Sequence, residues 1–286
     1  MVACSRGAQD FGSTQRTEIY VYGILPGDVE VDPQARGVGD PPGRVRLVRY
    51  RDLAALVSEV DRSAPLGRPQ DLRAHAELLD ASAAEVPVLP LRFGAVMPSE
   101  DAVARELLEE HYDELANALR ELEGHVQYVI KGRYVERTIL EEILSDAPEA
   151  AQLGESIKDV DQDASRQERL ALGKIVNDAV NAKRVADTRV LGGTLRGLVA
   201  ASTVRAPTHE LDAVHVAVLI VADAGQDMER AIGELARDWD GRIELRLNGP
   251  MAAYDFVGAP GAPPGTGVVL GRMAPVRAAS PGPVSL

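Results

Sequence analysis

The chain has 286 residues, of which 45% are apolar and 26% are charged, and its formal net charge at pH 7 is −13. This composition is typical of a globular protein with a sizeable core, and the length favours two domains. The acidic balance disfavours binding to nucleic-acid phosphates or to anionic lipid surfaces. With only one cysteine, Cys4, the chain has no internal disulfide and no thiolate metal cluster, which fits a reducing cytoplasm.

Both ends of the chain have compositions that favour disorder over a packed fold. Residues 1–16 are small and polar and lack the apolar run of a secretory signal, so we expect a disordered leader. Residues 258–286 hold six Gly and six Pro and no acidic residue, so we expect a disordered tail. No run of 18 apolar residues occurs, and a membrane-spanning helix is not expected.

Residues 17–123 are expected to form a first α+β domain. The stretch 17–25 is apolar on both faces, which predicts a central strand, and the alternation in 44–50 predicts its partner. A Gly- and Pro-rich stretch, 27–43, predicts a long exposed loop between them. Residues 51–60 carry apolar side chains at i, i+3, i+4 and i+7, which predicts a short amphipathic helix.

The rest of this domain is expected to be mainly helical. Composition and periodicity predict a helix over 70–84, and two prolines within 86–96 favour an edge or bulged strand. Ser99 is a predicted N-cap for a helix that extends to Glu123. This helix contains nine acidic and two basic residues, and we interpret it mainly as a solvated, acidic face.

Residues 124–257 are expected to form a second domain. The order of its elements, strand, helices, strand, strand, helix, strand, is the βαββαβ pattern of ferredoxin-like folds, with a helical insertion after the first strand. Pro148 is expected to end the first of its helices. The predicted strands are 125–134, 199–205, 213–224 and 242–249, and the main predicted helices are 136–145, 163–186 and 226–238.

The sequence shows no catalytic signature. Neither a dinucleotide-binding GxGxxG after a strand, nor a GxxxxGK[ST] loop, nor a GxSxG elbow is present. The spacing of His209 and His215 places them on different faces of a helix, which disfavours a metal pair. Adjacent acids such as Glu109 and Glu110 are interpreted as solvated side chains. We therefore expect no catalytic residue, no cofactor site and no metal site.

The segment VPVLPLRFGAVMPSED, 86–101, and the preceding HAELLD, 75–80, resemble the gas vesicle protein L/F family. Four further stretches, IYVYGIL, RDLAALVSEV, LRELEGHVQYVIKGRY and LNGPMAAYDFV, are similar to elements of that family in the same order. The resemblance covers roughly residues 17–257. In the closing stretch, Met251, Ala252 and Ala253 stand where the family usually has Trp-Pro-Pro.

The resemblance implies two α+β domains, the second a modified ferredoxin-like fold, and a non-enzymatic accessory or minor structural protein of gas vesicles. It implies a place in the cytoplasm or on the vesicle. The implied partners are the hydrophobic major shell protein, which such proteins hold soluble and help to assemble, and other accessory proteins. The positions that match the family motifs, as structural or partner contacts, are His75, Leu91, Arg92, Phe93, Gly94, Gly249, Pro250, Tyr254 and Phe256.

Two interpretations of the PLRFG stretch stay open. In one, Leu91 and Phe93 pack in the core and Arg92 pairs with a helix carboxylate such as Glu77; in the other, they contact a partner directly. Gly94 is expected to satisfy a backbone requirement, such as a bulge or a close approach of another chain segment. Two other classes of function are also open, a ligand-binding regulatory protein and a hydrolase or transferase with scattered Asp and His. The missing motifs weigh most against the last.

Overall fold

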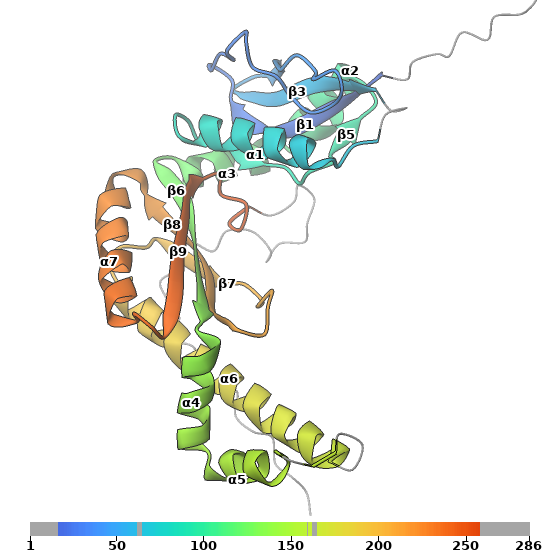
Figure 1. Ribbon diagram of the computed structural model, residues 1–286. Coiled ribbons are helices and arrows are strands. Elements are labelled where there is room, and N and C mark those ends of the chain that lie inside the picture. Colours follow the sequence, from blue (N-terminus) through green and yellow to red (C-terminus); the bar gives the residue numbers. More distant parts are fainter. Residues whose placement is uncertain (1–16, 62–64, 159, 162–164, 258–286) are drawn as a thin grey trace, which may run out of the picture. The chain divides into compact units, whose positions relative to one another are not determined.

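The structure is a computed structural model that describes residues 17–61, 65–158, 160–161 and 165–257 (Figure 1). The leader and the tail expected at the two ends lie outside these residues. The described chain forms two compact units, unit 1 ending at Arg120 and unit 2 beginning at Glu121. Each unit contains one antiparallel sheet with helices against it.

The sheet of unit 1 is built around β1 (Thr17–Pro26), which is buried along most of its length, as predicted for a central strand. Its neighbour on one side is β3 (Leu53–Asp61), and β2 (Arg46–Tyr50) forms the edge beyond β3. On the other side of β1 lie two short strands, β4 (Leu89–Pro90) and β5 (Val96–Met97). The prediction of an edge or bulged strand in 86–96 is confirmed as an edge strand, in two short pieces.

Two predictions in this sheet are wrong. Residues 51–60 do not form a helix, and 44–50 pairs with β3 instead of β1. Residues 53–61 form a strand and not a helix because β3 lies between β1 and β2, where Leu53 to Ser58 are all buried. The apolar side chains at helical spacing therefore belong to a strand whose two faces are both covered.

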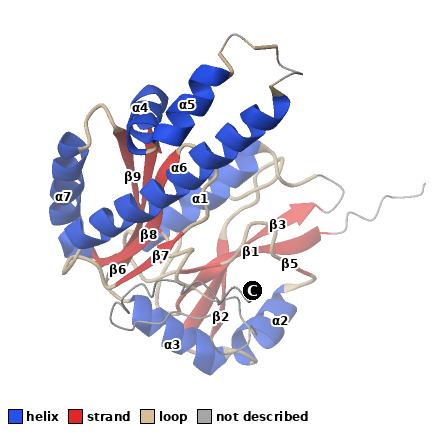
Figure 2. Cartoon of the chain, turned by 90° about the horizontal axis from the view of Figure 1, so that it is seen from below, coloured by secondary structure: helices blue, strands red, loops and turns tan. Residues whose placement is uncertain are grey.

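Helices lie on both sides of this sheet, α1 (Pro69–Ala83) on one and a broken helical stretch on the other (Figure 2). The broken stretch comprises α2 (Glu100–Ala102), the π-helical segment η1 (Val103–Glu109) and α3 (Tyr112–Leu122), so the prediction of one continuous helix is wrong. The predicted N-cap is confirmed, since the Ser99 hydroxyl accepts a hydrogen bond from the Ala102 N–H at 3.1 Å. Six apolar side chains of this stretch are buried: Val103, Leu107, Leu108, Leu115, Leu119 and Leu122.

The long stretch 27–43 is a loop, as predicted, but it is not exposed throughout. Val38 is 1% exposed, and its backbone lies against the sheet. The loop closes on itself through a backbone bridge between Arg36 and Arg44.

Unit 2 contains a four-stranded sheet in the order β7-β8-β6-β9, in which all neighbours are antiparallel. The strands are β6 (His125–Tyr134), β7 (Ala201–Val204), β8 (Asp212–Val221) and β9 (Ile243–Met251). Each lies where a strand is predicted. The prediction succeeds because the strands of this half of the chain are apolar runs bounded by turn-forming residues.

The helices of unit 2 fall in two groups along the chain. Between β6 and β7 come α4 (Glu136–Asp146), α5 (Pro148–Ser156) and α6 (Arg166–Thr194), and α6 ends eight residues beyond the predicted end at 186. Between β8 and β9 come the short η2 (Ala222–Ala224) and α7 (Gly225–Asp238).

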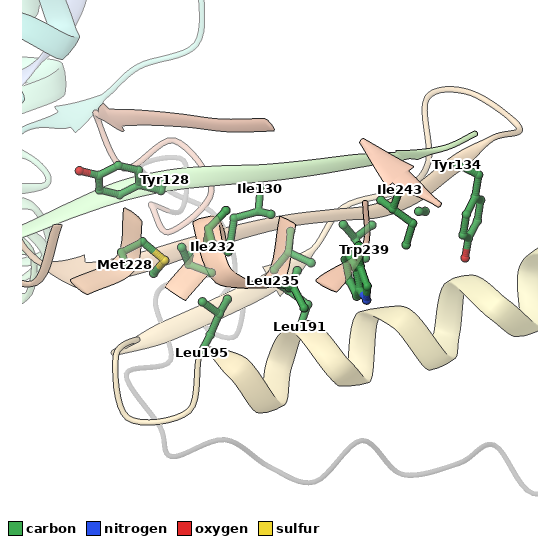
Figure 3. Close-up of a cluster of buried hydrophobic side chains, with 14 of the residues drawn as sticks. Tyr128, Ile130, Tyr134, Leu191, Leu195, Met228, Ile232, Leu235, Trp239 and Ile243 are labelled. Carbon is green, nitrogen blue, oxygen red and sulfur yellow. The ribbon is translucent and has the colours of Figure 1, made fainter. Parts of the chain in front are cut away.

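The core of unit 2 lies between one face of the sheet and helices α4, α6 and α7 (Figure 3). Figure 3 shows Leu191 of α6 and Leu195, which follows the end of that helix, on the same side of the strands as Ile232 and Leu235 of α7. Other members of this cluster include Val126, Tyr128, Ile130, Tyr134, Ile139, Ile143, Val180, Met228, Trp239 and Ile243. In the part of the chain that the structure describes, each helix is too short or too polar to cross a membrane.

Candidate functional site

The PLRFG stretch forms a bulge at the edge of the unit 1 sheet. The Leu91 N–H donates to the Tyr22 carbonyl at 2.8 Å, and the Val21 N–H donates to the Ala95 carbonyl at 2.9 Å. Between these anchors the chain turns through Gly94, whose φ is +91°. A Cβ at Gly94 would meet no atom within 4 Å, so the glycine is required for its left-handed backbone and not for space.

Four rings gather beneath this bulge, and we call them the ring cluster: Tyr20, Tyr22, His75 and Phe93. The Phe93 ring lies edge-on to His75 at 5.6 Å and to Tyr20 at 5.8 Å between centres. Tyr22 stacks on His75 at 5.7 Å. Such contacts add stability beyond the area they bury. Phe93 thus makes internal contacts that join the bulge to β1 and α1.

Hydrogen bonds fix the rings and the bulge to each other. The Tyr20 hydroxyl accepts from the Gly94 N–H at 3.0 Å and shares a hydrogen bond with His75 Nδ1 at 3.0 Å. His75 is 4% exposed, and this burial lowers its pKa, although the Leu91 backbone acts in the opposite direction. Burial also raises the pKa of Tyr20. His75 is therefore held neutral within an apolar aromatic setting.

The long loop 27–43 is joined to the same region through Tyr22 and Asp71. The Tyr22 hydroxyl accepts from the Val38 N–H at 2.8 Å, and Asp71 accepts from the Gly39 N–H at 3.2 Å. Asp71 is 1% exposed and also bonds Arg68, which holds its pKa below the usual range. These contacts explain why the loop is partly buried.

Arg92 does not behave as the core-packing interpretation expects. Its side chain is exposed, and among the described residues it forms no ion pair with Glu77 or any other carboxylate. The interpretation that includes this pair therefore lacks support at Arg92, which lies at the outer part of the bulge. Leu91 and Phe93 are half-buried, in agreement with a packing role.

The second motif segment closes unit 2. Gly249 in β9 has a φ of +140°, and a Cβ there would lie 2.7 Å from the Tyr128 ring and 2.8 Å from the Gln127 carbonyl oxygen. Glycine is required here for both backbone and space. Pro250 follows and is exposed, while Phe256 is 7% exposed.

A buried glutamine holds this closing segment to the sheet. The Gln127 side chain is fully buried, its Nε2 donates to Asp255 Oδ2 at 2.6 Å, and its Oε1 accepts from the Asp255 N–H at 2.9 Å. Arg205 Nε donates to Asp255 Oδ1 at 2.8 Å and its second nitrogen bonds the other oxygen. Tyr254 is half-buried beside this network. The motif residues thus make contacts within their own unit.

Several of these residues were not predicted from the sequence. Tyr20, Asp71 and Gln127 lie in stretches interpreted as ordinary strand or helix. One signal was available, since a glutamine within the apolar strand 125–134 requires a buried partner. Within the described residues, no three His, Cys, Asp or Glu side chains gather as metal ligands would.

The fold and these two segments define a two-sheet α+β protein whose motif residues brace an edge bulge and a closing segment. A family model described as "Gas vesicle synthesis protein GvpL/GvpF" matches residues 18–258. The chain is 34% identical over 243 residues to "Gas vesicle protein F" of Streptomyces sp. (strain CB03234), covering 83% of this chain and 98% of that protein. The chain belongs to the gas vesicle protein L/F family, and the resemblance seen in its sequence is confirmed.

Solved structures agree with the fold. The crystal structure of the gas vesicle protein GvpF from Anabaena sp. PCC7120 is similar with a TM-score of 0.65 and 21% identity, covering 83% of this chain and 94% of that one. The GvpF structure from Microcystis aeruginosa is similar with a TM-score of 0.68 and 20% identity, covering 83% and 97%. The family gives the chain a gas vesicle-related role, and it is not a known enzyme family.

Proposed function

We propose that this chain is a non-enzymatic accessory protein of gas vesicles that binds the hydrophobic shell protein, limits its aggregation and helps to assemble the vesicle wall. The observation that carries the proposal is the family match, which extends over residues 18–258 and therefore over both units. The proposed place of action is the vesicle and the surrounding cytoplasm, with other accessory proteins as further partners.

The physical basis of this role is a difference in surface character. A shell subunit that exposes apolar surface before assembly is prone to aggregate. A partner with a formal net charge of −13 would keep a complex with that subunit soluble. The acidic stretch 100–123, with nine acids and two bases, supplies over half of that net charge.

We also propose that the two units act as separate domains, 17–123 and 124–257, and that the second is a ferredoxin-like domain with a helical insertion. The strand order β9-β6-β8-β7 and the chain order of strands and helices support this assignment. In this proposal the α4–α6 segment supplies both the first helix of the pattern and the insertion. The motif residues serve to hold their own domain in shape.

The proposal is tested by expressing the shell protein of the same organism with and without this chain. We expect the soluble fraction of shell protein to rise several-fold with the chain present, and the two proteins to co-purify. A shell protein that stays equally insoluble and does not co-purify would overturn the proposed function. The Phe93→Ala variant tests the motif in the same experiment. If this variant folds, we expect it to bind the shell protein as the wild-type chain does.

A further inference from the structure

The turn between β2 and β3 has an unusual backbone. Arg51 has a φ of +52°, and it is the one non-glycine residue in the described chain with a positive φ. It occupies the first of two turn residues between Tyr50 and Leu53, a position where positive φ favours glycine. A non-glycine residue in this left-handed conformation costs free energy, and such residues cluster at functional sites. Arg51 occupies this position despite that cost.

The Arg51 side chain lies against two tyrosine rings. Its guanidinium carbon is 5.3 Å from the centre of the Tyr50 ring and 5.1 Å from that of Tyr112, and the two rings meet edge-on at 6.0 Å. Arg51 is exposed and both tyrosines are half-buried. We call these three residues the tyrosine–arginine patch.

Two carboxylates hold the tyrosines in place. The Tyr50 hydroxyl donates to Glu109 at 3.0 Å, and the Tyr112 hydroxyl donates to Asp52 at 3.0 Å. Glu109 ends the π-helical segment η1, and Tyr112 begins α3 after a break in the helix. π-Helical turns are rare in proteins, and a large share of those that exist lie at functional sites. Two irregular backbone features thus meet at one exposed, preorganised patch.

We infer that the tyrosine–arginine patch is a docking surface for a protein segment that presents a lysine or arginine beside apolar side chains. Tyrosine and arginine are, with tryptophan, the residue types enriched among the side chains that contribute most to binding at protein interfaces. The charge at the patch is negative, because Asp52 and Glu109, which accept hydrogen bonds from its tyrosines, outnumber its single arginine. Two further exposed acids, Glu110 and Asp113, adjoin Glu109 and Tyr112 in the chain. A cationic segment complements this rim. The inference rests on the proposed function only in seeking the partner among gas vesicle proteins.

The test uses a photo-crosslinking residue at Glu110, which is exposed and directly follows Glu109 in the chain, in cells that form gas vesicles with this chain. We expect an adduct with a gas vesicle protein, mapped by mass spectrometry to a segment that contains Lys or Arg. The matched control is the same residue at Arg73, exposed on α1 on the other side of the sheet. No adduct beyond that of the control, or an adduct mapped to an acidic segment, would overturn the inference.

The variant Arg51→Gly separates binding from folding. Glycine relieves the positive φ, so the melting temperature should stay the same or rise. We expect the adduct from position 110 to fall at least about tenfold, as for removal of a central interface residue. An unchanged adduct would mean that the patch merely fastens the β2–β3 turn to α3, and the inference would be wrong.

The outcomes also separate this inference from the proposed function. If the wild-type chain keeps the shell protein soluble and the Arg51→Gly chain does so equally, with an equal adduct, the inference fails and the proposed function stands. If the wild-type chain leaves shell solubility unchanged but forms the adduct with another gas vesicle protein, the proposed function fails and the inference stands.

Discussion

The environment of His75 makes the stability of unit 1 depend on pH. Burial lowers its folded-state pKa below the unfolded value of about 6.5. Between these two values the unfolded chain binds a proton that the folded chain does not. The stability due to neutral His75 is therefore fully present above about pH 6.5 and is lost as the pH falls through that value toward the folded pKa.

His75→Phe tests this dependence. The phenyl ring keeps the ring contacts and removes the titrating group, so the variant should lose less stability than the wild type between about pH 7.5 and 5.5. The difference in slope is at most about 1.4 kcal/mol per pH unit. Urea unfolding at several pH values measures it, and parallel curves for the two proteins would contradict the assignment.

Glycines in unit 2 offer a second comparison at the scale of residues. Gly249→Ala would strain a backbone with φ of +140° and push a Cβ against the Tyr128 ring, so we expect a loss of about 1–3 kcal/mol. Gly233→Ala is the matched control, since a Cβ there meets no atom within 4 Å inside helix α7, and it should gain about 0.4–1 kcal/mol. Thermal unfolding of both variants checks the signs, and equal effects would refute the account.

Among the elements, helix α6 is fastened to the sheet of unit 2 by a buried carboxylate. Asp187 is 6% exposed, accepts from the Tyr134 hydroxyl at 2.6 Å and receives two bonds from Arg242 at 3.0 Å each. Arg242 also bonds Glu142 of α4 at 2.7 Å. One hydrogen-bond network thus joins α4 and α6 to β6 and to Arg242, the residue just before β9.

Removing this carboxylate should be far more costly than removing an exposed one on the same helix. Asp187→Ala leaves Tyr134 and Arg242 without their main partner, and we expect a loss of about 3 kcal/mol. Asp178→Ala removes only an exposed pair with Lys174, at a cost below about 0.5 kcal/mol. Denaturant unfolding compares the two, and similar midpoints would show that the network contributes little.

The elements also show where sequence reasoning succeeds and where it fails. The strands of unit 2 and helix α1 were predictable because their apolar periods match the observed structure. The prediction for residues 51–60 was wrong because Leu53, Leu56, Val57 and Val60 have the spacing of a helix face. In the structure, β1 and β2 on either side stabilise a strand. Local pattern does not reveal which neighbours cover a segment, so the tertiary context overrides it.

The candidate sites show the same limit. The special backbone of Gly94 followed from its place in PLRFG, but its hydrogen bond to Tyr20 joins residues 74 positions apart. The contact between Gln127 and Asp255 joins residues 128 positions apart. Such pairs depend on strand order and register, which one sequence does not specify. The patch around Arg51 was missed for the same reason, since Tyr112 was assigned to a continuous helix.

For the whole molecule, the central claim is that an acidic protein of two units, matched to the gas vesicle protein L/F family over nearly all its described length, serves shell assembly. The most direct measurement removes this chain from cells that form gas vesicles and determines how shell protein divides between vesicles and an insoluble pellet. We predict that shell protein moves to the pellet and returns to vesicles when the wild-type chain is restored. Vesicles in normal number, with no added pellet, would contradict the account.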